Sequence, residues 1–151
     1  MVVGVGGQVE LGEDAVDVLG DRLLGDHQLR GDAGVALGLT NSPGELCDMI
    51  AARSSEGYRR VKLKIEPDRD LEWVRAARAR FPKLTLAVDA NGAYRSEDFD
   101  HLARFDEFGL AFLEQPLHDE DLLGHVHLAE ILKTPICLDE PLVSLGATKA
   151  A

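Results

Sequence analysis

The sequence predicts an α/β fold of about five βα units, and the spacing of its charged residues is the main reason. Four short apolar runs each end near a charged residue, and Lys64, Asp89, Glu114 and Asp139 follow one another at intervals of 25 positions. A strand, a loop and a crossover helix fill such an interval. We therefore expect a partial (β/α)8 TIM barrel, truncated at both ends, because a complete barrel needs about 250 residues and this chain has 151.

Composition limits the partners that the protein can have. The net charge of −11 argues against nucleic acid and anionic membranes, since both need a basic patch. The chain has no run of about 18 apolar residues, and residues 1–20 lack the Lys or Arg of a signal peptide. We expect a cytoplasmic protein that binds a small molecule. Cys47 and Cys137 are expected to be buried, reduced thiols rather than a disulfide.

The first ordered elements should follow an irregular start. Residues 1–32 form a Gly- and Asp-rich segment without a steady period, and residues 33–151 form the barrel domain. Ala33 to Leu39 reads as a buried strand. Ser42 should then cap a helix with Pro43 at its first position and Glu45 completing a capping box. This helix runs to about residue 55 and ends at a left-handed Gly57.

The strand around Val61 to Ile65 alternates apolar and basic side chains. In an extended chain, its apolar residues face one way, whereas Lys62 and Lys64 face the other, which is the interior in a barrel. Two ammonium groups in an interior need anions close by. A helix with apolar positions from Leu71 to Phe81 follows.

Three more strands and two helices complete the pattern. The strands are expected at Leu84–Val88, Leu110–Leu113 and Ile136–Leu138, the helices at Ser96–Phe105 and Asp119–Leu132, and a further helix should begin near Ser144. Five strands of a sheet that closes with eight leave two open edges, so we expect self-association through those edges.

Parallel strands place their carboxyl ends at one edge of a sheet or barrel, so the four evenly spaced residues should lie at one level. Asp89, Glu114 and Asp139 have oxygen ligands that suit Mg²⁺, or else Mn²⁺. The alternative is that the two aspartates cap loops or helices and that Glu114 is a solvated acid. The five histidines are scattered, and we expect all of them on the solvated surface.

The lysine pair suggests a base. Lys64 lies nearer the carboxyl end of its strand, and a neighbouring ammonium together with a cation would lower the pKa of its side chain toward the working range. Lys62 would supply that charge and bind a substrate carboxylate. The alternative is a structural lysine pair neutralised by Asp89 and Glu114, without turnover.

The motifs together resemble the enolase superfamily, in its muconate-lactonizing subgroup. The resemblance rests on the Lys-Leu-Lys strand, on Asp89-Ala90-Asn91, on Leu113-Glu114-Gln115-Pro116 and on the run from Ile136 to Glu140, and it covers residues 33–151. Within that subgroup, the sequence is most similar to o-succinylbenzoate synthases and N-acylamino acid racemases.

The resemblance implies a fold, a cofactor and a reaction. Asp89, Glu114 and Asp139 would bind Mg²⁺, Lys64 would remove a proton α to a carboxylate, and Mg²⁺ and Lys62 would hold the resulting ene-diolate. Loss of hydroxide would follow, as in menaquinone biosynthesis. Asn91 and Glu140 match polar positions that bind substrate or support the site.

Two functions from different classes remain open. The first is a metal-dependent carbon–oxygen lyase of the o-succinylbenzoate synthase type, or a related racemase or isomerase. The second is a catalytically silent, truncated barrel fragment, because members of the family carry a second lysine that would fall near position 163 and an amino-terminal capping domain that residues 1–32 do not resemble.

Overall fold

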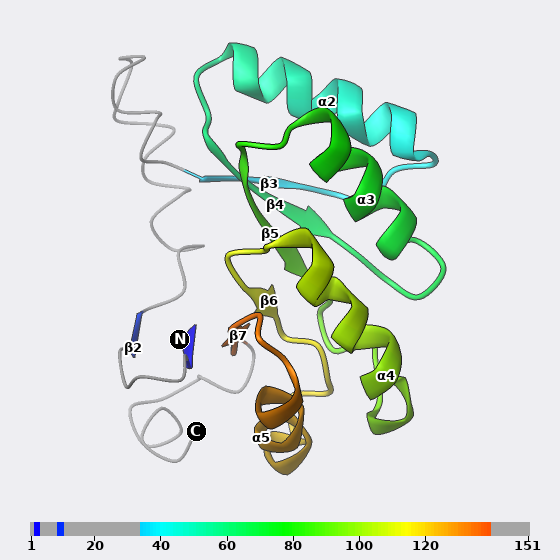
Figure 1. The fold of residues 1–151 in the computed structure, drawn as a ribbon, viewed down its shortest axis with the longest axis vertical. Helices are drawn as coiled ribbons and strands as arrows, with labels where there is room; N and C mark the ends of the chain where they lie inside the picture. Colours follow the sequence, from blue (N-terminus) through cyan, green and yellow to red (C-terminus); the bar gives the residue numbers. More distant parts are fainter. Residues whose placement is uncertain (1, 4–8, 11–33, 140–151) are drawn as a thin grey trace. The chain divides into compact units, whose positions relative to one another are not determined.

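The computed structural model describes residues 2–3, 9–10 and 34–139 of the chain (Figure 1). The chain divides into two compact units, one of residues Glu13–Ala87 and one of Met1–Gly12 with Val88–Ala151. In both units, parallel strands alternate with helices, which confirms the predicted α/β class. Within the part of the chain that the structure describes, every helix is too short or too polar to cross a membrane.

The unit of residues 13–87 has the strand order β5-β4-β3. Its elements are β3 (Gly34–Leu37), α2 (Pro43–Ser55), β4 (Arg60–Lys64), α3 (Leu71–Arg80) and the start of β5 (Thr85–Asp89). β3 and β4 are parallel, with Leu37 opposite Leu63. β5 begins where the backbone N–H of Thr85 donates to the carbonyl of Arg59 at 3.2 Å. The strands predicted for this region are therefore present.

Helix α2 begins as its sequence predicts, with one difference in the cap. The hydroxyl of Ser42 accepts a hydrogen bond from the N–H of Glu45 at 3.1 Å, and Pro43 occupies the first turn. The carboxylate of Glu45 accepts from the N–H of Asn41 at 2.9 Å rather than from that of Ser42, so the expected capping box is shifted by one residue. Gly57 has φ 104°, in agreement with its predicted role after the helix.

The core of this unit follows the alternation in β4. Val61 and Leu63 are buried, whereas Lys62 is half-buried and Lys64 is exposed. Helices α2 and α3 lie side by side (Figure 1) and contribute buried residues such as Ile50 and Val74. Burying aliphatic side chains stabilises the unit by about 1.5–3 kcal/mol each. This apolar layer fixes β4 and therefore the direction of its two lysines.

The second unit has the strand order β2-β1-β7-β6-β5. β6 (Leu113–Glu114) is parallel to the end of β5 and to β7 (Ile136–Cys137). Two short strands, β1 (Val2–Val3) and β2 (Val9–Glu10), lie within the segment expected to be irregular. β1 is antiparallel to β7 and occupies the edge of β7 that we expected to be open.

The helix predicted at Ser96–Phe105 is instead a succession of three short helices. They are η2 (Ser96–Asp98), α4 (Phe99–Leu102) and η3 (Ala103–Phe108), of which η2 and η3 are 3-10 helices. The large apolar residues recur every third position, at Phe99, Leu102, Phe105 and Phe108. A 3-10 helix has three residues per turn, so this spacing places them on one face, and the last three are buried.

Side-chain caps fix the ends of the remaining elements of this unit. Asp121 caps α5 (Leu122–Ile131) by accepting from the N–H of Gly124 at 2.9 Å. The carboxylate of Asp106 accepts from the backbone N–H of Lys133 at 3.0 Å and of Thr134 at 2.8 Å, just before β7. Cys137 and Cys47 are both buried, and they are thiols rather than a disulfide, which confirms the prediction for both.

Candidate metal-binding site

Two of the expected metal ligands are neighbours across a pair of parallel strands. In the ladder between β5 and β6, Asp89 lies opposite Glu114. Paired residues of adjacent parallel strands project to the same face, and the strands are about 4.8 Å apart. Glu114 is only 5% exposed, whereas Asp89 is half-buried. The carboxyl ends of β5 and β6 therefore place two acids side by side.

The third expected ligand lies further along its strand than the even spacing suggests. Glu114 is opposite Cys137 in the ladder between β6 and β7, so Asp139 follows two residues beyond that level. The prediction that all these acids lie at one level is therefore wrong for Asp139. Adjacent strands of a barrel are staggered, and equal sequence intervals do not give equal heights. Asp139 is exposed, and its N–H donates to Oε1 of Gln115 at 3.0 Å.

The chain turns sharply after β5 and after β6. Asn91 has φ 44° and Gln115 has φ 38°, values in the left-handed region that non-glycine residues seldom adopt. The N–H of Asn91 donates to Oδ1 of Asp89 at 3.1 Å and so orients that carboxylate. The N–H of Gly92 donates to the carbonyl of Gln115 at 2.7 Å, which joins the two turns.

The acids can be tested for their fit to a divalent cation. All three expected ligands are carboxylates, the donors that Mg²⁺ prefers. A buried carboxylate such as that of Glu114 needs positive charge or hydrogen-bond donors around it, and a cation supplies positive charge. Among the described residues, no group of three His, Cys, Asp or Glu side chains is arranged to hold a metal ion. The type of donor suits Mg²⁺, but of the three expected ligands the structure places only Asp89 and Glu114 opposite each other.

The two lysines belong to the other unit. β4 turns Lys62 and Lys64 away from its buried side chains, as the alternation predicts. Lys62 lies opposite Ala36 of β3, so the neighbouring side chain on the same face is small. The short methyl group of Ala36 leaves room beside the long stem of Lys62.

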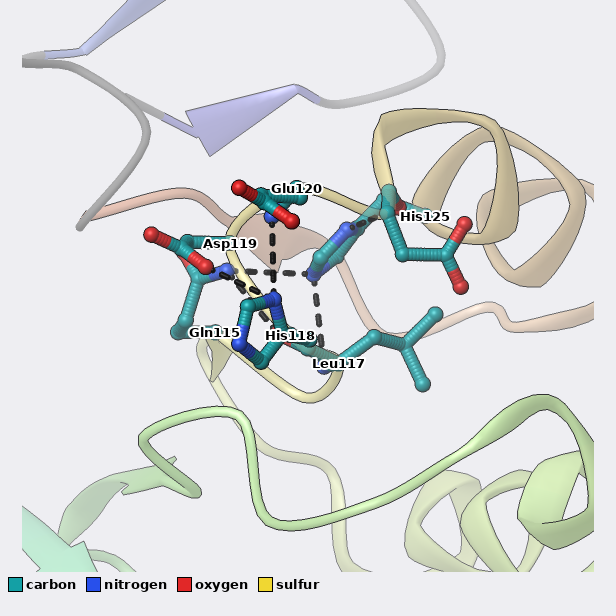
Figure 2. Close-up of polar contacts among 7 residues, drawn as sticks. Gln115, Leu117, His118, Asp119, Glu120 and His125 are labelled. Carbon is teal, nitrogen blue, oxygen red and sulfur yellow. Dashed lines mark hydrogen bonds and ion pairs between the residues drawn. The ribbon is translucent and has the colours of Figure 1, made fainter.

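The structure also brings together two residues that the sequence reasoning missed. Gln115 is 1% exposed and His125 is 4% exposed, and their side chains face each other with 3.4 Å between the two Nε2 atoms (Figure 2). The expectation that every histidine lies on the surface is therefore wrong for His125. Helix α5 is apolar on most of its circumference, so periodicity could not show which side is buried. His118, in contrast, is exposed and pairs with Asp119 at 2.8 Å.

Most of the chain matches one protein family. The family model described as Enolase C-terminal domain-like matches residues 45–151, which is most of the chain. The chain belongs to this family. The three acids and both lysines lie within the matched region.

Curated relatives in the enolase family are longer than this chain. An N-succinylamino acid racemase from Amycolatopsis sp is 50% identical over 119 residues, which is 78% of this chain and 32% of the relative. An o-succinylbenzoate synthase from Geobacillus stearothermophilus is 42% identical over 120 residues, which is 80% of this chain and 32% of that relative. The chain therefore spans about a third of the length of the curated relatives that it matches.

Solved structures of the enolase superfamily have the same fold over the shared region. A protein from Enterococcus faecalis V583, described as an unknown member of the enolase superfamily, is 43% identical with a TM-score of 0.75, and the match covers 78% of this chain and 32% of that one. A probable mandelate racemase from Alicyclobacillus acidocaldarius is 42% identical, also with a TM-score of 0.75, over 78% of this chain and 31% of its own. The superfamily and the resemblance inferred from the sequence motifs are thereby confirmed.

Proposed function

We propose that this chain forms the metal-binding and proton-abstracting part of a carbon–oxygen lyase of the o-succinylbenzoate synthase type. The observation that carries the proposal is the pairing of Asp89 with Glu114 at the carboxyl ends of two parallel strands. The 42% identity to a relative named o-succinylbenzoate synthase supports the choice of reaction. The substrate would be a small carboxylate, whose charge the two lysines suit.

Each proposed role follows from the chemistry of the side chain. Asp89, Glu114 and Asp139 would hold Mg²⁺ or Mn²⁺ through carboxylate oxygens. When bound, the cation would stabilise negative charge that develops on the substrate carboxylate. Lys64 would be the base and Lys62 would bind the carboxylate, the support for both being the motif and the direction in which β4 turns them.

The reaction balances without any further reagent. The neutral amine of Lys64 takes the proton from the carbon α to the carboxylate, and the electron pair of the C–H bond moves onto the carboxylate. In a lyase, that pair then forms a carbon–carbon double bond while hydroxide leaves the adjacent carbon. Between these two steps, the substrate carboxylate carries a second negative charge, and the ammonium group of Lys62 stabilises it.

Asn91 and Glu140 have supporting roles in this proposal. The N–H of Asn91 donates to Oδ1 of Asp89, so the turn at Asn91 would orient this carboxylate for a cation. Glu140 lies outside the described residues, and its proposed role rests on the sequence motif alone.

A racemase is the second candidate, because the relative that is 50% identical is named N-succinylamino acid racemase. Racemisation begins with the same removal of a proton by Lys64. It differs in that a proton returns to the same carbon from the opposite side. The substrate would then be an N-succinylamino acid.

The cation site is tested by binding of Mn²⁺, which is detected by its EPR signal. We expect the chain to bind Mn²⁺ in competition with Mg²⁺, and E114Q to weaken binding at least tenfold because it removes a buried ligand charge. The matched control is E130Q, which makes the same change at an exposed position of α5. Absence of Mn²⁺ binding by the unaltered chain would favour the catalytically silent fragment instead.

The base is tested separately by exchange of the α proton in D₂O. An N-succinylamino acid incubated with the chain and Mg²⁺ should incorporate deuterium, and NMR detects the loss of the α-proton signal. K64R should abolish the exchange because a guanidinium stays protonated, while K83R at an exposed position should not. Equal exchange rates for both variants would remove Lys64 from the mechanism.

A further inference from the structure

The buried pair of Gln115 and His125 needs an explanation beyond packing. Burying an amide and an imidazole is unfavourable unless each of their polar atoms finds a partner. Neither side chain carries out a step in the proposed reaction. His125 of α5 meets Gln115 in the turn after β6 (Figure 2). From Gln115 the hydrogen bonds continue to Asp139, two residues beyond β7.

The partners of His125 fix its tautomer. Nδ1 lies 2.7 Å from the carbonyl oxygen of Asp121, which can only accept, so Nδ1 carries the proton. Nε2 lies 3.3 Å from the backbone N–H of Leu117, which can only donate, so Nε2 is the acceptor. Helix α5 and the loop after β6 therefore hold His125 as a neutral imidazole, and the lone pair of Nε2 is shared between the N–H of Leu117 and the amide of Gln115.

This lone pair fixes the amide of Gln115 in turn. Nε2 of Gln115 donates to the carbonyl of Leu117 at 3.0 Å and faces Nε2 of His125 at 3.4 Å. A flipped amide would direct its oxygen at two acceptors and its NH₂ group at the N–H of Asp139. Only one orientation satisfies all the partners, and it leaves Oε1 to accept from Asp139 at 3.0 Å.

The backbone conformation of Gln115 explains why its side chain, and not its own C=O group, accepts the hydrogen bond from Asp139. In a parallel ladder, one residue donates its N–H to one partner and accepts through its C=O from a residue two positions further along the neighbouring strand. Gln115 donates to the carbonyl of Cys137 at 2.8 Å, so its own C=O would normally accept from Asp139. Its left-handed conformation turns that C=O to Gly92 instead, and the side-chain amide takes its place.

We propose that Gln115 and His125 are positioning residues that hold Asp139 at the carboxyl end of β7 and thereby set the affinity of the cation site. The inference rests on the proposed function for its consequence, since Asp139 is one of the proposed ligands. Removing the acceptor for Asp139 releases the backbone that carries this ligand. Residues that orient metal ligands typically change affinity by 10- to 100-fold when they are altered.

A pair of His125 variants separates positioning from general stability. H125Q keeps an acceptor near the place of Nε2 and loses the bond to Asp121, whereas H125N keeps the bond to Asp121 and loses the acceptor. Each variant loses one side of the imidazole, so the two should lower Tm by similar amounts. We expect H125N to weaken Mn²⁺ binding about tenfold and to speed hydrogen exchange at the Asp139 amide, and H125Q to restore both.

The measurements distinguish failure of this inference from failure of the proposed function. If the unaltered chain binds Mn²⁺ and the two variants have equal Kd and equal exchange at Asp139, His125 has only a structural role. If the chain binds no Mn²⁺ but exchange at Asp139 still differs between the variants, the positioning holds and the metal function is wrong. Q115M is the second test, because its apolar side chain is similar in length and removes the acceptor even if H125N does not fold.

Discussion

β4 and β6 both end in proposed site residues, but different interactions hold them in place. β4 is five residues long, and its apolar and basic side chains alternate so that burial of one face fixes the other. β6 has only two residues, both buried, and the chain beyond it turns left-handed. In β4, packing determines the direction of the functional side chains. At the end of β6, individual hydrogen bonds do so.

The largest effect should follow from removing packing beneath β4. Leu63 is 1% exposed, and L63A leaves a cavity under the strand. We expect the free energy of unfolding to fall by about 3 kcal/mol, measured by urea denaturation. L39A, at a position that is 39% exposed, should cost less than about 1 kcal/mol. Equal losses for the two variants would mean that burial does not hold β4.

A smaller effect should come from the turn that joins the ends of β5 and β6. Gly92 has φ 71°, and a Cβ there would lie 3.2 Å from the carbonyl oxygen of Leu117 and 3.3 Å from Cα of His118. G92A therefore adds crowding against backbone to the cost of a left-handed alanine, together about 2 kcal/mol. G109A has a similar φ of 57° with nothing within 4 Å, and should cost only about 1 kcal/mol. Thermal unfolding of both variants compares the cost of backbone strain alone, in G109A, with the cost of strain and crowding together, in G92A.

The smallest effect concerns Asp106, whose carboxylate accepts hydrogen bonds from two backbone N–H groups just before β7. Burial would raise the pKa of its carboxyl, but the hydrogen bonds from the backbone N–H groups of Lys133 and Thr134 outweigh this and lower it. A lowered pKa means that the folded state is stabilised above the unfolded-state pKa, and that this stabilisation is lost as pH falls through the folded-state pKa. Because Asp106 is only half-buried and solvent screens its charge in part, D106N should cost only about 1 kcal/mol at pH 7.

The dependence on pH gives this prediction its test. The stability difference between the unaltered chain and D106N should shrink as pH falls below about 4, the usual pKa of an aspartate, and through the lowered folded-state pKa, because the carboxylate then becomes protonated in both states. D100N changes an exposed acid in the same helical segment, and it should show no such difference. A difference that stays constant from pH 7 to pH 3 would rule out the charge of Asp106 as its cause.

The helices and strands could be predicted from the sequence where the local preferences of the residues and the burial of apolar side chains agree. The alternation from Val61 to Ile65 gave the buried face of β4, and the sequence around Ser42 gave the first turn of α2. The pairing of Asp89 with Glu114 followed from the spacing of 25 residues. In these places, local propensity and burial favour the same structure.

Other features could not be predicted because they depend on contacts with residues that are far apart in the sequence. The level of Asp139 depends on the stagger between β6 and β7, which no interval in the sequence encodes. Burial of His125 depends on which side of an apolar helix meets β6. The segment from Ser96 to Phe108, in which two 3-10 helices flank a short α-helix, does carry a signal. An apolar residue occupies every third position, and a prediction based on 3.6 residues per turn overlooks this spacing.

The left-handed turn at Gln115 makes opposing demands on the residue type. The backbone there favours glycine or asparagine, the residues that adopt such angles at least cost. Glycine has no amide to offer, and asparagine is one methylene shorter and would fall short of Asp139. Glutamine is thus a compromise at position 115: the chain accepts local torsional strain in exchange for reach, and no other natural uncharged amide has a side chain of that length.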